Sequence, residues 1–301
     1  MGVLKAYPFS SKLVMLICLM LGGMFLGTIL ALVLIRPVFG LDILSDMSLL
    51  TVNSTNPATI PLLKFVQFMQ ATFMFIVPAH LYATWVNKDN VVHVLSLHKA
   101  PAYHFLFGGA LIIAFAPTVA GLSILNEQMQ LPGFMAGIES WMRTAEQSAE
   151  RLTNMFLQAD TFSGLLINLL VIAIIPAIGE ELIFRGILQK LFIEKTRSIH
   201  TGIWLTAIIF SAFHMQFYGF LPRVALGAVL GYGMVWSGTI WVPVLMHLIN
   251  NGTAVILDFL YKNHYITINF NAEENFPLIS ALFSILISFA LVFYWNRRKH
   301  L

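Results

Sequence analysis

Long apolar stretches alternate with short polar segments along this chain. A helix needs about 20 mainly apolar residues to cross the hydrocarbon core of a bilayer, and eight stretches approach or exceed that length. The predicted spans are residues 13–35, 61–86, 101–126, 160–184, 200–217, 222–236, 240–261 and 277–296. The fifth and sixth are short for a full crossing, so we expect them to be tilted or half-buried. The pattern predicts an all-α, polytopic membrane protein with about eight transmembrane helices.

Composition supports the same class. Of the 301 residues, 58% are hydrophobic and only 10% are charged, which leaves too little polar surface for a soluble domain. The single cysteine, Cys18, excludes a disulfide framework and a cysteine-based metal site. The first apolar run is too long for the core of a signal peptide, and no small-residue cleavage site follows it, so it is predicted to be a retained span.

Charge fixes the expected orientation. Threading the spans with the N-terminus inside places most basic residues on one side of the membrane and most acidic residues on the other. The basic set is Lys5, Lys12, Lys88, Lys99, Arg185, Lys190, Lys195, Arg197, Arg297, Arg298 and Lys299, and the acidic set is Asp42, Asp46, Glu127, Glu139, Glu146, Glu150, Asp160, Glu273 and Glu274. The positive-inside rule then predicts that both termini are cytoplasmic. Compact loops and the lack of targeting signals favour a bacterial inner membrane, and no nucleic-acid partner is expected.

Two external loops differ in character. Residues 37–60 are rich in Ser, Thr, Asn and Pro and are expected to be irregular. Residues 135–157 repeat apolar positions at helical spacing, with Glu and Arg between them. This pattern predicts an amphipathic helix, either lying on the outer leaflet or packed as a surface helix on the bundle. Within the spans, glycines four residues apart (Gly23 with Gly27, Gly227 with Gly231) are expected to let helices approach closely.

Two adjacent carboxylates, Glu180 and Glu181, follow the apolar run 165–178 at the edge of the fourth predicted span. An acidic residue at the centre of a transmembrane helix costs about 2.5–3.5 kcal/mol, so an uncompensated pair is not expected there. Arg185 lies four residues after Glu181 on the same helical face, which predicts an ion pair. Glu180 has no local partner, so its partners must come from elsewhere in the chain. The predicted orientation puts it at the cytoplasmic end of the span.

Polar residues on two later spans could complete a site with Glu180. Phe210 and His214 share one face of the fifth span, so the phenyl ring can wall the imidazole. His247 and Asn251 share one face of the seventh, where the amide could orient the imidazole or donate to a developing oxyanion. A carboxylate base, an assisting histidine and a His/Asn pair that stabilises a tetrahedral intermediate fit the activation of water.

The same set fits a metal site. Glu180, His214 and His247 could bind catalytic zinc, because one carboxylate and two imidazoles leave a coordination position open. We prefer a metal-free mechanism, since neither histidine has an obvious local carboxylate of the kind that commonly orients a ligating histidine. The zinc signature His-Glu-x-x-His is also absent from the chain.

Each residue taken alone also has an ordinary structural interpretation. Membrane-embedded histidines often serve as hydrogen-bonded packing residues, and adjacent glutamates can form a solvated charge pair at a membrane edge. His80 and His104 lie within predicted spans without comparable partners and are expected to be structural. Asp258 lies about three turns beyond His247 and is expected to be a packing or interfacial acid. The combination across three helices, rather than any single residue, favours a site.

Three short motifs occur in order on successive helices within 72 residues: Glu180-Glu181-x-x-x-Arg185, Phe210-x-x-x-His214 and His247-x-x-x-Asn251. In this they resemble the CAAX-protease and bacteriocin-processing family of intramembrane endopeptidases, which includes the eukaryotic CAAX prenyl endopeptidase. The resemblance covers about residues 160–262. It implies an eight-helix fold around a polar intramembrane cavity. Residues 158–301 would supply the catalytic core helices, and residues 1–157 the N-terminal helices of the same membrane unit.

The resemblance also implies hydrolysis of a peptide bond in a membrane-associated peptide or protein. Glu180 would activate water, His214 would assist it, and His247 and Asn251 would take the oxyanion side. Members of the family are commonly labelled metalloproteases, and a metal-free glutamate mechanism is also argued for them. Two other functions remain open: a transporter or proton relay that uses intramembrane Glu and His, and a non-catalytic membrane scaffold.

Overall fold

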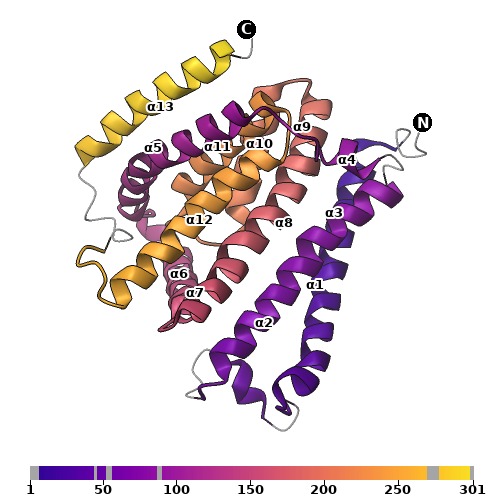
Figure 1. The fold of residues 1–301 in the computed structure, drawn as a ribbon, viewed down its shortest axis with the longest axis vertical. Helices are drawn as coiled ribbons and strands as arrows, with labels where there is room; N and C mark the ends of the chain where they lie inside the picture. The colour runs from indigo at the N-terminus through magenta and orange to yellow at the C-terminus, as the bar shows by residue number, and fades with distance from the viewer. Residues whose placement is uncertain (1–6, 44–45, 52–55, 87–89, 270–277, 299–301) are drawn as a thin grey trace.

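The computed structural model describes residues 7–43, 46–51, 56–86, 90–269 and 278–298, and these are helices joined by loops, without a strand among them (Figure 1). Seven helical segments within these ranges are long and apolar enough to cross a membrane: Phe9–Phe39, Thr59–Val86, Ala102–Glu127, Phe162–Thr196, Phe220–Ser237, Trp241–Lys262 and Ile279–Arg298. The predicted all-α membrane fold is confirmed. The fifth predicted span is the shorter apolar helix α10 (Ile199–Phe213), so full-length crossings number seven in the described part of the chain.

The helices form a row of packed neighbours. The N-terminal group consists of α1 (Phe9–Phe39), α2 (Thr59–Ala71), the π-helical η3 (Thr72–Ile76), α3 (Val77–Leu81) and η4 (Tyr82–Val86). At the other side, α13 (Leu278–Arg298) packs on α5 (Ala102–Glu127), and α12 (Trp241–Lys262) packs between α5 and the central helix (Figure 1). Gly23 and Gly27 lie directly against the backbone or Cβ atoms of Phe73 and Met69, which is the close approach expected of them.

The central helix is one continuous series of 35 residues, Phe162–Thr196. It consists of α7 (Phe162–Asn168), η6 (Leu169–Ile174), α8 (Ile175–Ile183), η7 (Phe184–Leu188) and α9 (Gln189–Thr196), of which η6 and η7 are π-helical. The predicted span 160–184 was therefore too short, and Glu180 does not lie at an end of the helix. Glu180 lies near the middle, 18 residues after Phe162 and 16 before Thr196.

The helix continues beyond the apolar run because its next polar face is buried. Glu181, Arg185 and Gln189 recur every fourth residue, and each is at most 2% exposed. This face packs towards α10 and α11 (Phe220–Ser237), which form an antiparallel pair beside the central helix. The polar side chains therefore find partners inside the protein, which is the condition for keeping them at membrane depth.

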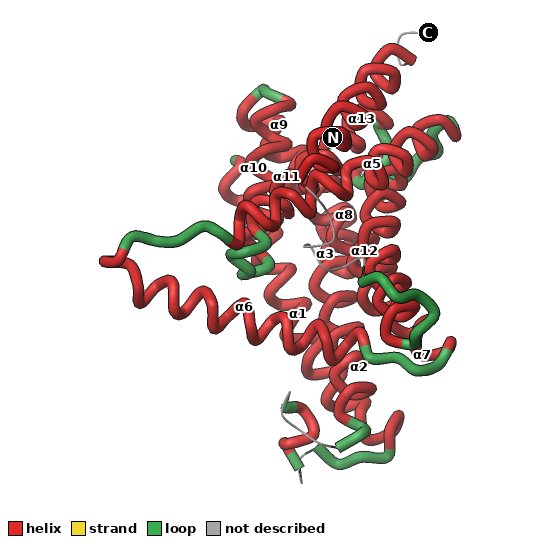
Figure 2. Tube along the Cα trace, turned by 90° about the vertical axis from the view of Figure 1, so that its left-hand side faces the viewer, coloured by secondary structure: helices red, strands yellow, loops and turns green. Residues whose placement is uncertain are grey.

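The amphipathic helix predicted at 135–157 is confirmed as α6 (Ala136–Leu157), which lies across the bundle (Figure 2). It has no fully buried residue, and it contacts α2, α12 and the loop after α10. The ring centroids of Trp141 and Phe217 are 5.1 Å apart, and the Arg143 guanidinium lies 4.8 Å from the Tyr218 ring centroid. Arg143 also donates to Glu139 and holds the pKa of that carboxyl below its usual range. The helix is thus a surface helix with one docked face.

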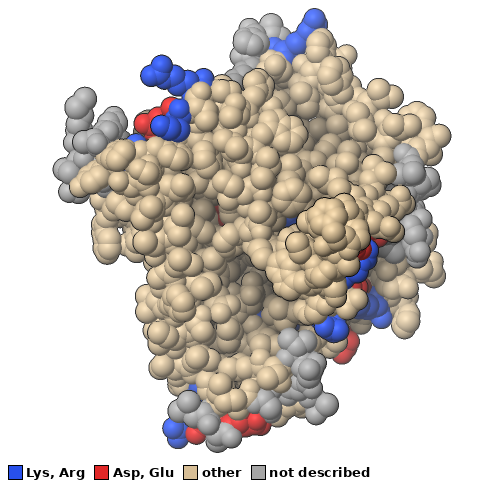
Figure 3. Space-filling view, turned by 180° about the vertical axis from the view of Figure 1, so that it is seen from behind, with Lys and Arg blue, Asp and Glu red and all other residues tan. Residues whose placement is uncertain are grey.

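The start of α1 and the end of α13 lie at the same end of the molecule (Figure 1). Seen from behind, charged side chains gather near the ends and in one lateral strip, and most of the remaining face is uncharged (Figure 3). This arrangement fits an integral membrane protein. The cytoplasmic orientation of the termini stays a prediction, and five of the residues behind it lie outside the described ranges: Lys5, Lys88, Glu273, Glu274 and Lys299.

Candidate active site

A closed polar network fixes the middle of the central helix to α11. Arg185 donates from Nη1 to Glu181 Oε1 at 2.9 Å and from Nη2 to the Gly227 carbonyl at 3.0 Å, and both charged side chains are fully buried. One turn further along, Gln189 donates to the Gly231 carbonyl at 3.1 Å. The guanidinium also lies 4.7 Å from the centroid of the Phe210 ring. Ion pair, carbonyl and ring together offset part of the cost of burying the charged Arg185, whose Nε has no hydrogen-bond partner among the described residues.

The two glycines of α11 do more than allow close packing, which is all that the sequence predicted for them. Their carbonyls accept hydrogen bonds from Arg185 and Gln189, and a Cβ atom on Gly227 would lie 3.2 Å from Ala207 of α10. A Cβ atom on Gly231 would lie 2.7 Å from Oε1 of Gln189 and 2.9 Å from Cγ2 of Ile203. Glycine is therefore required at this position for the central helix and α11 to share hydrogen bonds.

His247 on α12 is bound to the same network. Its Nδ1 lies 2.9 Å from Glu181 Oε1, so this nitrogen donates to the carboxylate, and Nε2 of the neutral ring keeps its lone pair. Glu181 thus accepts from Arg185 and His247 with one oxygen. The sequence predicted no local orienting carboxylate for either histidine, and the carboxylate that orients His247 comes from another helix. The sequence did not reveal it because the partner lies 66 residues away on another helix.

Nε2 of His247 faces two other predicted site residues. Asn251 Nδ2 lies 3.2 Å from it, and Glu180 Oε2 lies 4.0 Å from it. Asn251 also donates to the Ile172 carbonyl at 3.3 Å. Ile172 belongs to the π-helical η6, where the wider turn changes the intrahelical hydrogen bonding and makes a carbonyl available to a neighbouring helix. The π-helical segment therefore helps to hold Asn251 beside the imidazole.

Glu180 differs sharply from its neighbour Glu181. Its side chain is 14% exposed, and its Oε2 atom is buried without a hydrogen-bond partner among the described residues. A buried carboxylate oxygen without a donor costs free energy, so it is retained where it has a use. The adjacent carboxylates thus have separate environments: Glu181 is held through Oε1 by Arg185 and His247, although its Oε2 also has no hydrogen-bond partner among the described residues, and Glu180 Oε2 is free to accept a proton donor.

His214 reaches the site from the end of α10. Its Nδ1 donates to the Phe210 carbonyl at 2.9 Å, which leaves Nε2 of the neutral ring unprotonated. The Phe210 ring stands edge-on to both histidines, with centroid distances of 5.0 Å to His214 and 6.1 Å to His247. Glu180 and His247 are close enough to act on the charge of His214. The structure thus brings all four predicted residues to one place, with His214 the only one of them hydrogen-bonded solely to its own helix.

The residues expected to be structural lie apart from this site. His104 accepts a hydrogen bond of 2.8 Å from the Trp295 indole, which ties α5 to α13. Asp258 forms an ion pair with Lys262 at 3.0 Å, one turn along α12. His80 is exposed on α3.

The predicted alternative of a zinc site can be tested against the positions of the donor atoms. Among the described residues, no group of three or more His, Cys, Asp or Glu side chains is placed to hold a metal ion. Two ligand atoms of a tetrahedral zinc, with bonds of about 2.0–2.1 Å, lie about 3.3 Å apart. Glu180 Oε2 and His247 Nε2 are 4.0 Å apart, and Asn251 already donates towards Nε2. The residues as placed therefore do not fit the metal.

Fold and site define an all-helical membrane protein with a Glu/His/His/Asn constellation inside the bundle, and similarity to known proteins points the same way. Residues 162–253 match the family described as Type II CAAX prenyl endopeptidase Rce1-like. This segment contains all three motifs and begins where the central helix begins. The resemblance to the CAAX-type endopeptidases that the motifs predicted is confirmed. No solved structure matches the chain.

Bacterial relatives cover the same region. "Putative membrane peptidase YdiL" of Bacillus subtilis (strain 168) is 28% identical over 107 residues, which are 36% of this chain and 43% of that protein. "Uncharacterized protein YpbD" of the same organism is 29% identical over 86 residues, 27% of this chain and 41% of the relative. An "Uncharacterized 24.3 kDa protein" of Escherichia coli is 25% identical over 142 residues, 46% and 58% of the two chains. The chain thus spans about half the length of the curated relatives it matches.

Proposed function

We propose that this protein is an intramembrane endopeptidase in which Glu180 activates water to hydrolyse a peptide bond of a membrane-associated substrate. One observation carries the proposal: Oε2 of Glu180 is buried and unpaired, 4.0 Å from His247 Nε2, in the middle of a membrane-spanning helix. A water molecule about 2.8 Å from each of these two atoms fits their separation.

Proton transfer and bond cleavage follow from this placement. Glu180 takes a proton from the water as its oxygen attacks the carbonyl carbon, and a tetrahedral intermediate forms. The C–N bond then breaks, and the proton passes from Glu180 to the leaving nitrogen. Nε2 of His214, unprotonated because Nδ1 donates to Phe210, can accept a hydrogen bond from the water or relay the proton.

Stabilisation of the oxyanion is assigned to Asn251, with His247 beside it. Both hydrogen bonds of the Asn251 amide are long, at 3.2 Å to His247 and 3.3 Å to the Ile172 carbonyl, so turning one N–H to a charged oxygen is favourable. When that N–H leaves Nε2 of His247, the lone pair becomes available to the attacking water. Glu181 keeps the ring in the required tautomer by accepting from Nδ1 throughout.

The proposal is tested with the purified full chain in detergent or nanodiscs, incubated with a peptide library and analysed by mass spectrometry. Cleavage by the wild type and none by Glu180→Gln supports it. Cleavage by both proteins at equal rates assigns the activity to a contaminant. Proton movement in liposomes without cleavage would instead favour the proton relay.

A further inference from the structure

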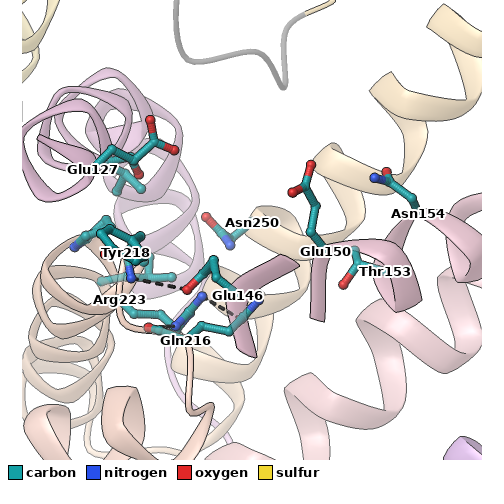
Figure 4. A pocket seen from close by; sticks show the side chains of 14 residues that line it. Glu127, Glu146, Glu150, Thr153, Asn154, Gln216, Tyr218, Arg223 and Asn250 are labelled. Carbon is teal, nitrogen blue, oxygen red and sulfur yellow. Dashed lines mark hydrogen bonds between the residues drawn. The ribbon is translucent and has the colours of Figure 1, made fainter. Parts of the chain in front are cut away.

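A second polar cavity, with a volume of about 500 Å³, lies beside the candidate active site (Figure 4). We call it the acidic pocket. It is lined by the end of α5, the second half of α6, the loop after α10 and the start of α11. Its charged residues are Glu127, Glu146, Glu150 and Arg223, so three carboxylates face one guanidinium.

The cationic side chain of the pocket, Arg223, is already hydrogen-bonded to Gln216. Arg223 donates to the Gln216 carbonyl at 3.2 Å and to Gln216 Oε1 at 2.7 Å. Glu146 accepts a hydrogen bond of 3.2 Å from the Tyr218 amide. In Figure 4, Glu146, Gln216 and Arg223 cluster together, whereas Glu127 and Glu150 lie on either side of Asn250. Glu146, Gln216 and Arg223 therefore have hydrogen-bond partners within the protein, whereas Glu127 and Glu150 at the rim have none among the described residues.

Glu127, Glu150 and Ser123 are among the polar groups of the pocket that have no hydrogen-bond or ion-pair partner among the described residues. Glu127 and Glu150 are exposed at the rim, and neither forms an ion pair with a described cation. Ser123 is different because it is only 9% exposed and yet its hydroxyl lines the cavity without a hydrogen bond. A buried hydroxyl on a helix usually bonds to protein or water, so this one marks a place for a polar ligand.

The pocket is joined to the active site through two residues. Asn250 lines the pocket and donates to Asn251 Oδ1 at 3.0 Å. A residue of the acidic pocket is therefore hydrogen-bonded to a residue of the candidate active site. Arg223 lines the pocket and acts electrostatically on Glu180 and His214. A peptide whose scissile bond lies at Glu180 therefore places a nearby side chain in the acidic pocket.

We propose that the acidic pocket binds a lysine or arginine side chain of the substrate close to the scissile bond. The proposal rests on the proposed peptidase function and adds a specificity to it. Carboxylates bind guanidinium and ammonium groups through charge-assisted hydrogen bonds, and a cleft with walls of one sign concentrates the opposite charge. The Ser123 hydroxyl accepts from one of the remaining N–H groups of the ligand.

A peptide series tests this specificity. The wild-type chain in nanodiscs is given peptides that differ at one position near the cleaved bond, carrying arginine, norleucine, glutamine or glutamate there. We expect kcat/KM for the arginine peptide to exceed that for the norleucine peptide by about tenfold or more at one position. The Glu127→Gln/Glu150→Gln variant should lose this preference while cleaving the norleucine peptide within about twofold of the wild type. Glu194→Gln, an exposed carboxylate on α9, is the matched control and should keep the preference.

A binding measurement separates this inference from the peptidase function. Carbodiimide labelling of Glu127 and Glu150 is followed by mass spectrometry, with and without the arginine peptide, on wild type and on Glu180→Gln. Protection by the arginine peptide but not the norleucine peptide supports the pocket even where no cleavage occurs. Cleavage without any charge preference, together with equal labelling, overturns the inference and leaves the peptidase intact. Preference for the glutamate peptide also overturns it, because Arg223 would then be the group that binds substrate.

Discussion

The two polar regions of this bundle differ in how far their charges are satisfied. The network around Glu181 is sealed: Arg185 bridges to α11, His247 bridges to α12, and both ion-paired side chains are fully buried. The acidic pocket is open, and two of its carboxylates have no ion-pair partner among the described residues. Paired charges hold helices in one arrangement, whereas charges without an ion-pair partner remain available to a ligand.

Glu180 shares a feature with each of these two regions, and this combination explains its character. Glu180 directly precedes Glu181 on the same helix, so the network around Glu181 also fixes the backbone of Glu180. Its own Oε2 remains unpaired, as the rim carboxylates of the pocket do. Rigid positioning of an unsatisfied group is what a general base requires. Substitutions that affect only one of the two regions should therefore separate stability from catalysis.

The largest effect is expected from Glu180→Gln. The substitution keeps size and shape but removes the base, so we expect kcat to fall by about 10²–10⁴-fold or to become undetectable. Thermal stability and folded yield should stay close to those of the wild type, because Oε2 makes no hydrogen bond among the described residues. Peptide cleavage and thermal melts of the purified variant measure both. Residual activity above about one tenth of the wild type, roughly 1.4 kcal/mol of barrier, would contradict the role of base.

Arg185→Ala should damage the sealed region instead. It leaves Glu181 buried with His247 as its remaining partner, and breaking a buried pair on one side costs about 3–5 kcal/mol. Exposure at a membrane edge would lower this cost, but both side chains are fully buried. Folded yield and melting temperature should fall together with activity. A variant with wild-type stability and turnover would show that the network does not hold the site.

Asn251→Ala is expected to act mainly on turnover. Loss of an oxyanion donor costs about 10²–10³-fold in kcat, and the hydrogen bond to Ile172 is lost as well. KM should change little, because the amide is used in the transition state rather than in binding. Asn250→Ala is the useful comparison, since it removes the neighbouring amide but leaves the Asn251 N–H groups in place. Equal losses of kcat in both variants would mean that the hydrogen bond between Asn250 and Asn251, not an oxyanion donor, is what turnover depends on.

Gly231→Ala should cost less, by overpacking. A Cβ there meets Gln189 Oε1 and Ile203, and overpacking of a tight contact costs about 1–3 kcal/mol. The measurement is the melting temperature, and Gly22→Ala is a matched control because a Cβ at that position meets nothing within 4 Å. If the Gly231 variant melts with the control, the shared hydrogen bonds of Gln189 do not depend on glycine.

The membrane helices could be read from the sequence because an apolar run of helical length has few alternative structures. The extension of the central helix to Thr196 was missed, since the run of apolar residues ends before Glu180. A signal did exist: Glu181, Arg185 and Gln189 repeat every fourth residue, as one continuing face would. Composition alone does not show that such a face is buried.

The site residues were recognisable as types, but their pairing was not. His247 and Asn251 lie four residues apart, and the distance between Nε2 and Nδ2 is a local consequence of that spacing. The bond from His247 to Glu181 and the gathering of Glu127, Glu146 and Glu150 in one pocket depend on tertiary packing. Sequence spacing has no access to such contacts, so the acidic pocket was not predicted at all.

The smallest effect is expected from metal removal, and here the structure alters the argument. The sequence favoured a metal-free mechanism because no carboxylate was seen to orient a histidine. Glu181 is such a carboxylate, so that reason no longer holds. We still propose the metal-free mechanism, now because Glu180 Oε2 and His247 Nε2 are 4.0 Å apart and Asn251 donates towards Nε2.

Dialysis against a strong chelator should then change kcat/KM by less than about twofold at neutral pH. If Glu180, His214 and His247 instead bind zinc, activity should vanish and return with one equivalent of the ion. Metal affinity should then also fall as pH drops through the ordinary imidazole pKa, about 6.5, because protonated rings cannot bind metal. Elemental analysis across preparations decides between the two, since zinc that tracks activity at one equivalent would overturn the metal-free mechanism.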